Sequence, residues 1–281
     1  MIQVFKYFAV LALLSGCVTT PGHNPRDAPA TNLDELDRTW AGGHVYIPNT
    51  PGGTGQVAGF GRTSNMDKPL AKLGAAPRYP AIVYLHGCSG RGIAARTTGA
   101  FLAKAGYLIV QPDSFARAYK PKSCDPRTKR GGLHRDAVAW RRAEAAHAIR
   151  RVRGWPFVDP RNVFLMGFSQ GGITTATFEG KREAEAVRGR IIEGWTCHSG
   201  WADHDGLAAT DNEPVLALLG ERDPWFIKLP STRGHCGQRM NTSNGSASHV
   251  FTSPLANKHH MIAYPDIQKL VVDFLDRHRL R

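Results

Sequence analysis

Residues 163–172 read Val-Phe-Leu-Met-Gly-Phe-Ser-Gln-Gly-Gly, and this stretch decides the fold. A short apolar run leads directly into the pattern G-x-S-x-G, with Ser169 at its centre. Between a strand and a helix, this pattern is typical of a sharp turn that lifts the serine oxygen out of the sheet, at the N-terminal end of the helix. The pentapeptide alone is a weak signal, so its context carries the prediction that Ser169 is a nucleophile.

Apolar runs and helical segments alternate on both sides of this motif. The predicted strands cover residues 44–48, 81–85, 107–110, 163–166, 191–195 and 215–219, with a last one beginning at 250, and the predicted helices cover 95–105, 133–153 and 267–275. This alternation predicts an α/β fold with a mainly parallel central sheet and helices on both faces. In such sheets ligands bind beyond the carboxyl ends of the strands, so the loops there should carry the chemistry.

Two segments have weaker patterns. Residues 50–72 contain many glycines and are expected to be irregular or to form a weak hairpin. The arginines of the predicted helix 133–153 are expected on a solvated face rather than in a binding patch.

The composition is that of a globular protein. Of 281 residues, 42% are apolar and 21% charged, which excludes a disordered chain, a collagen-like fibre and a coiled-coil rod. The formal net charge of +13 favours anionic partners in general. The basic residues are spread along the chain, however, so we expect a basic surface and no nucleic-acid binding.

The N-terminus has the pattern of an export signal. The apolar run at residues 7–14 follows Lys6 and is shorter than the ~20 residues that span a bilayer. It leads into Leu14-Ser15-Gly16-Cys17, and a short apolar run followed by small residues is typical of a cleavable secretory signal. An ordinary signal peptide with an incidental cysteine is the alternative to the interpretation that follows.

The ending Leu-Ser-Gly-Cys resembles the bacterial lipoprotein signal. This resemblance implies cleavage before Cys17, lipidation of that residue, and a protein anchored to a membrane of the cell envelope, facing the periplasm. Val18 stands where an aspartate would favour inner-membrane retention, so the outer membrane is expected. The domain prediction is a signal peptide at 1–16, a lipidated cysteine and flexible tether at 17–40, and a single domain at 41–281.

A serine nucleophile needs a general base, and the base needs an orienting acid. In a fold of this kind the chain order is serine, acid, histidine, so both partners should follow Ser169. Asp223 lies just beyond the strand 215–219 and is the predicted acid, with Glu221 as its strongest rival and Asp203, Asp205 and Asp211 as alternatives before that strand. The base is expected at His259 or His260, because His249 would precede the last strand and His278 lies near the end of the closing helix.

An oxyanion hole requires backbone N–H donors aimed at the developing negative charge. One donor is expected at Gln170, directly after the nucleophile. The other is expected at Cys88, in the loop His86-Gly87-Cys88 that follows the strand 81–85.

Together these residues resemble the α/β-hydrolase fold and, within it, the dienelactone hydrolase-like group. The resemblance spans residues 80–281 and is carried by 84–90, 105–107, 111–117, 159–161, 166–172, 219–224 and 260–265. In related hydrolases the histidine stands a few residues before a proline that opens the last helix, and His260 and Pro265 match this pattern, which favours His260 as the base. Dienelactone hydrolase itself has a cysteine nucleophile where this chain has Ser169, so we do not carry over its substrate.

The resulting prediction is hydrolysis of carboxylic esters, or lactones, on Ser169, His260 and Asp223 through an acyl-enzyme, with a small-molecule ester as substrate. This mechanism implies no metal and no organic cofactor. A serine peptidase or polyester depolymerase on the same triad is one alternative, and a non-catalytic lipoprotein that binds a ligand is another. Phe115, Arg117 and Trp225 are candidate substrate-binding residues, with Arg117 facing an acidic group.

Four cysteines remain besides Cys17. An even number in an exported protein suggests disulfides, and four cysteines allow three pairings. Cys88 and Cys124 follow two neighbouring early strands, and Cys197 and Cys236 follow two later ones. These positions favour the pairs 88–124 and 197–236, each of which would hold a long loop beside the site.

Overall fold

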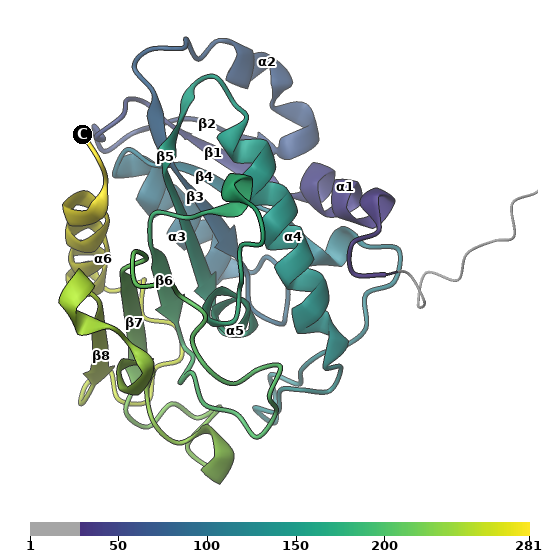
Figure 1. Cartoon of the computed structure of the whole chain (residues 1–281), viewed down its shortest axis with the longest axis vertical. Coiled ribbons are helices and arrows are strands. Elements are labelled where there is room, and N and C mark those ends of the chain that lie inside the picture. The colour runs from purple at the N-terminus through teal and green to yellow at the C-terminus, as the bar shows by residue number, and fades with distance from the viewer. Residues whose placement is uncertain (1–28) are drawn as a thin grey trace, which may run out of the picture.

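The computed structural model describes residues 29–281, which form one eight-stranded sheet covered by helices (Figure 1). The predicted signal peptide and Cys17 lie outside the described residues. The strands are β1 (His44–Pro48), β2 (Val57–Arg62), β3 (Tyr79–Leu85), β4 (Leu108–Gln111), β5 (Val158–Phe168), β6 (Arg190–Glu193), β7 (Val215–Gly220) and β8 (Ala247–Phe251). The helices are α1 (Leu33–Gly42), α2 (Asp67–Ala71), α3 (Ile93–Lys104), α4 (Asp136–Arg153), α5 (Gln170–Ala176) and α6 (Pro265–His278).

The sheet has the strand order β2-β1-β4-β3-β5-β6-β7-β8. β1 pairs antiparallel with β2 and β4, and all other neighbours are parallel. The predicted mainly parallel sheet is therefore confirmed. Residues 50–72, expected to be irregular or to form a weak hairpin, instead contain the single strand β2, which pairs with β1 outside this range, and the short helix α2. β8 begins at Ala247, so His249 lies within the last strand rather than before it.

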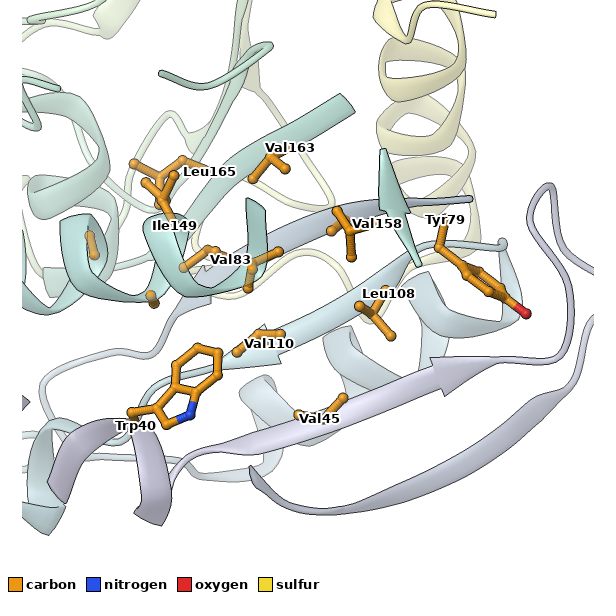
Figure 2. Packing of buried hydrophobic residues seen from close by; sticks show 14 of the residues in the cluster. Trp40, Val45, Tyr79, Val83, Leu108, Val110, Ile149, Val158, Val163 and Leu165 are labelled. Atoms are coloured by element: carbon orange, nitrogen blue, oxygen red, sulfur yellow. The ribbon is translucent and has the colours of Figure 1, made fainter. Parts of the chain in front are cut away.

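The two faces of the sheet are buried by different helices. In β3, Ala81, Val83 and Leu85 pack towards α4, while Ile82 and Tyr84 pack towards α3 and α6. Successive side chains of a strand point to opposite faces, and all seven residues of β3 are buried, which explains its uninterrupted apolar sequence. Figure 2 shows the first of these layers, in which Val83, Val110 and Leu165 of the strands belong to the same cluster as Ile149 of α4.

The folded part begins earlier than the sequence analysis predicted, because residues 33–40 belong to α1 and not to a tether. The Asn32 side chain caps this helix by accepting a hydrogen bond from the Glu35 N–H. Leu36 and Trp40, one turn apart, are buried, and Trp40 packs against Trp155 with ring centroids 5.4 Å apart. α1 therefore lies beside α4 and closes one edge of the core (Figures 1 and 2).

No helix in the range 29–281 is long and apolar enough to cross a membrane.

Candidate active site

Ser169 lies at the turn between β5 and α5, as the sequence pattern predicts. Its φ of 57° is in the left-handed region, which a residue with a side chain adopts only at a cost. The turn is tight: a Cβ at Gly167 would lie 2.1 Å from the Gly171 carbonyl oxygen, and one at Gly171 would lie 2.0 Å from the carbonyl oxygen of Leu85. Glycine is thus required on both sides of the serine, and the serine is presented at the edge of the sheet.

Asp223, the predicted acid, is paired with His259. The aspartate is 2% exposed, and its Oδ2 lies 2.6 Å from Nδ1 of His259. Aromatic rings surround the imidazole: Phe168 at 4.9 Å, Trp225 stacked at 5.3 Å and Phe226 at 5.8 Å between centroids. Nε2 of His259 is buried and forms no hydrogen bond with any residue in the range 29–281.

The preference for His260 as the base is wrong in this geometry. Nδ1 of His260 lies 3.0 Å from Oε1 of Glu193, a carboxylate at the end of β6, and not beside Asp223. Adjacent side chains in this loop diverge, so only one histidine can reach Asp223. Burial lowers the pKa of His260, but the hydrogen bond to Glu193 and its charge outweigh burial and raise the pKa above its ordinary value. The rival acid Glu221 is exposed.

The loop with the predicted oxyanion donor lies against the serine. A Cβ added to Gly87 would lie 3.5 Å from the Cβ of Ser169, so the backbone that leads into Cys88 passes directly beside this serine. Gln170 is the first residue of α5, where an N–H group has no partner within the helix. Both predicted donors therefore lie next to Ser169.

His86 and Arg141 hold this loop in place. His86 is buried; its Nδ1 lies 2.7 Å from the Gly87 carbonyl oxygen, and its Nε2 accepts the Ser114 N–H at 3.2 Å. These contacts require a neutral ring, and burial together with the Arg141 charge lowers the pKa of His86 well below its ordinary value. Arg141 donates to the His86 carbonyl and to the Gln170 side chain. Arg141 of α4 is 2% exposed, so this arginine is not on a solvated face as expected.

A cavity of about 760 Å³ opens at Ser169. Its walls include Cys88, Cys124, Gln170 and an aromatic set made of Trp195, Trp201, Trp225 and Phe226. Cations lie among the lining residues as well, namely Lys129, Arg130, Arg222 and Lys228. Trp225, a candidate substrate-binding residue, lines this cavity, and its role in binding stays a prediction.

The other two candidate substrate-binding residues lie elsewhere. Arg117 is 6% exposed; its Nε lies 2.5 Å from Oε1 of Glu144, and its guanidinium stacks over Trp140. Phe115 packs edge-on against His86 and is not one of the residues that line the cavity. The prediction that Arg117 faces an acidic substrate group is therefore wrong, because a buried carboxylate of the protein already occupies the guanidinium.

Both predicted disulfides are present, Cys88–Cys124 and Cys197–Cys236. The first joins the loop of Cys88, with the predicted oxyanion donor, to the segment that forms one wall of the cavity. The second joins the chain after β6 to a short helical turn before β8.

Sequence reasoning missed Glu193, Gly194 and Arg141. Glu193 offered a signal, since it is a lone carboxylate at the end of an apolar strand, and a buried charge in such a place requires partners. Arg141 offered none, because nothing in the sequence separates it from the other arginines of α4.

The mainly parallel sheet with Ser169 at the sharp turn between β5 and α5 is that of the α/β-hydrolase fold. The chain belongs to the dienelactone hydrolase family, whose model matches residues 69–270. Membership in this family supports a hydrolase that acts on esters. No curated protein matched the sequence.

Two solved structures illustrate the shared fold. A protein from Klebsiella pneumoniae subsp. pneumoniae described as a dienelactone hydrolase has 14% sequence identity and a TM-score of 0.50, with 73% of this chain and 89% of that chain covered. Thermogutta terrifontis esterase 2, phosphonylated by sarin, has 18% identity and a TM-score of 0.51, with 84% and 89% covered. These similarities confirm the α/β-hydrolase fold.

Proposed function

We propose that this protein is a serine hydrolase that cleaves carboxylic esters through an acyl-enzyme, with Ser169 as nucleophile, His259 as general base and Asp223 as the orienting acid. The observation that carries the proposal is the 2.6 Å hydrogen bond between His259 and the buried Asp223, together with the packing of the His259 ring 4.9 Å from Phe168, the residue before Ser169. Membership in the dienelactone hydrolase family and the fold shared with an esterase support it.

In this mechanism the Ser169 oxygen attacks the ester carbonyl while Nε2 of His259 takes its proton. Asp223 keeps the other ring proton on Nδ1 and stabilises the imidazolium that forms. The N–H groups of Cys88 and Gln170 stabilise the oxyanion. His259 then protonates the leaving alcohol, and a water molecule activated by the same histidine releases the acid.

The cavity indicates the kind of ester. Aromatic walls of Trp195, Trp201 and Trp225 favour substrates with a planar or apolar group, because such walls bury apolar surface and stack on rings. A lactone is an internal ester and reacts by the same steps, so the proposal includes this subclass.

The test is covalent labelling. Purified protein is treated with a fluorophosphonate probe beside Ser169→Ala, and hydrolysis of short-chain p-nitrophenyl esters is measured in parallel. Labelling and turnover that both disappear in Ser169→Ala, with unchanged circular dichroism, support the proposal. Absence of labelling in the folded wild type contradicts the proposal and favours the alternative of a non-catalytic ligand-binding protein. Panels of peptide and polyester substrates test the alternatives of a serine peptidase and a polyester depolymerase.

We also propose that the protein is exported and anchored to the envelope by lipid on Cys17. The sequence Leu14-Ser15-Gly16-Cys17 supports this, and so do two disulfides, since disulfides persist in oxidising compartments. Cys17→Ser should move the protein from the membrane pellet to the soluble fraction and abolish incorporation of labelled palmitate. Unchanged pelleting of this variant would contradict the anchor.

A further inference from the structure

Glu193 contacts both halves of the site through different atoms. It is the last residue of β6 and is fully buried, with an exposed fraction of 0%. Its backbone carbonyl accepts the Ser169 N–H at 2.8 Å, at the strained turn. Its carboxylate reaches the other way, to the loop that carries His259. One residue therefore links the nucleophile turn to the loop of the base.

Three donors converge on one oxygen of this carboxylate. Oε1 accepts the N–H of Met261 at 2.6 Å and the N–H of Ile262 at 3.1 Å, and it lies 3.0 Å from Nδ1 of His260. Burying a carboxylate costs several kcal/mol unless hydrogen bonds and an opposite charge compensate. Hydrogen bonds to a charged acceptor are about twice as strong as neutral ones, so this carboxylate holds residues 260–262 firmly.

The next residue supports His259 itself. Gly194 has a φ of 63°, and a Cβ added there would lie 2.9 Å from the His259 carbonyl oxygen and 3.2 Å from its Nδ1. The imidazole thus rests on the Gly194 backbone at one side, while Trp225 stacks on it 5.3 Å away. The position of the ring depends on where the loop 259–262 is fixed, and Glu193 fixes it.

We propose that Glu193 and His260 form a positioning pair that fixes His259 relative to Ser169. The inference rests on the proposed function and explains the second of the two adjacent histidines: His260 is a partner that supplies a donor to the buried carboxylate. Neither residue is a catalytic residue in this proposal, since both act through the backbone of the loop and the turn.

The experiment compares Glu193→Gln, His260→Asn, His260→Leu and Glu185→Gln with the wild-type protein. Glu193→Gln keeps the size and the acceptor oxygen but removes the charge. In His260→Asn the new amide can still donate to Glu193 from near the position of Nδ1, whereas in His260→Leu no donor remains. Glu185 is the matched control, because it is also a buried carboxylate that accepts from an arginine and from a backbone N–H, but it pairs with Arg150 and is not one of the residues that line the cavity at Ser169.

Ester kinetics separate positioning from a structural role. For Glu193→Gln and His260→Leu we expect kcat to fall about 10- to 100-fold, since small displacements of a reacting group cost this much, with KM changed less than about twofold. His260→Asn should keep most of the wild-type kcat, and Glu185→Gln should keep all of it even if its Tm falls. Fluorophosphonate titration gives the concentration of active sites, so kcat refers to folded protein in each case.

Each outcome is decisive. Wild-type kcat in both Glu193→Gln and His260→Leu overturns the inference while the proposed function stands. If Glu193→Gln does not fold, the kinetics of the two His260 variants test the proposal. The His260 side chain is partly exposed, so its replacement leaves the core intact. Loss of activity in His260→Asn as large as in His260→Leu would overturn the donor role. A wild-type protein without esterase activity or labelling would refute the proposed function, and this inference with it.

Discussion

Nδ1 of His259 lies 2.6 Å from Oδ2 of Asp223, although the two residues are 36 positions apart in the chain. Asp223 is withdrawn from solvent, and a charge-assisted hydrogen bond in such surroundings is stronger than one at the surface. The bond places a proton on Nδ1 and sets the orientation of the ring. Nε2 is then the atom that can accept a proton from a donor.

We expect a large loss of activity when either His259 or Asp223 is substituted. His259→Ala and Asp223→Asn should each reduce kcat for a p-nitrophenyl ester about 10⁴-fold, because the first removes the base and the second favours the wrong tautomer. Circular dichroism of the folded variants shows whether a lower kcat reflects the missing side chain rather than unfolding, since aromatic rings pack on His259. Steady-state kinetics of the two variants make the measurement. If His259→Ala retained more than a tenth of the wild-type kcat, the assignment of the base would be refuted.

Gly194→Ala should impair catalysis without touching a reacting group. Its φ of 63° strains any residue with a side chain, and the added methyl would collide with the His259 backbone and ring. We expect kcat to fall by about 10-fold or more and the unfolding free energy to fall by about 1–2 kcal/mol. Urea denaturation and ester kinetics check the two effects. A variant with wild-type kcat would show that the ring does not depend on this contact.

Much of the fold followed from local pattern. The apolar strands are buried on both faces and therefore read as continuous runs, and the glycines around Ser169 are required by contacts under 3 Å that any larger residue would violate. Disulfide pairs could be anticipated because parallel strands bring the loops after them to one edge of the sheet.

The choice between His259 and His260 could not be derived from local pattern. The two residues are adjacent, and what separates them is Glu193, which is 67 positions from His260 and meets it only in the folded chain. The prediction for Arg117 was wrong for a similar reason, since its partner Glu144 lies 27 positions away on α4. The role of a charged residue depends on partners far along the chain, which the local sequence does not show. The role of an apolar run follows from the burial of that segment alone.

Stability should fall as the pH decreases below about 6.5, the ordinary pKa of histidine. The folded protein keeps His86 neutral because burial and Arg141 lower its pKa, while the unfolded chain binds the proton. The contribution of His86 to the free energy of unfolding is therefore complete above the pKa that His86 has in the unfolded chain. It decreases by up to about 1.4 kcal/mol per pH unit as the pH falls towards the lower pKa that His86 has in the folded protein. The pKa of His44, lowered to about 4 by burial and then by Arg91, acts in the same direction.

His86→Gln isolates this contribution. Urea midpoints measured at pH 7.5 and 5.5 should differ less in the variant than in the wild type, because the group that takes up the proton on unfolding is gone. Equal pH dependence in the two proteins would mean that His86 is already able to bind a proton in the folded state.

We expect both disulfides to stabilise the fold but only Cys88–Cys124 to affect kcat. Replacing Cys197 and Cys236 by serine should lower the unfolding free energy by about 2–4 kcal/mol, as for a typical disulfide, with kcat retained in the folded protein, since neither residue lines the cavity. Replacing Cys88 and Cys124 should lower both stability and kcat, because this bridge holds the backbone that carries the proposed oxyanion donor. Equal kcat values in the two double variants would argue against that role.

Trp225 is expected to contribute to substrate affinity more than Phe115, although the sequence made both candidates. Trp225 lines the cavity, stacks on His259, and has the Lys129 ammonium 5.6 Å above its ring. Trp225→Ala should raise KM for aromatic esters by about 10-fold, equivalent to about 1.4 kcal/mol of lost stacking and apolar contact, and should raise KM for acetate esters less. Phe115→Ala should leave both KM values within about twofold, because Phe115 packs on His86 outside the cavity. Kinetics on a matched pair of benzoate and acetate esters make the measurement, and a larger effect of Phe115→Ala on KM would place the substrate against Phe115 instead.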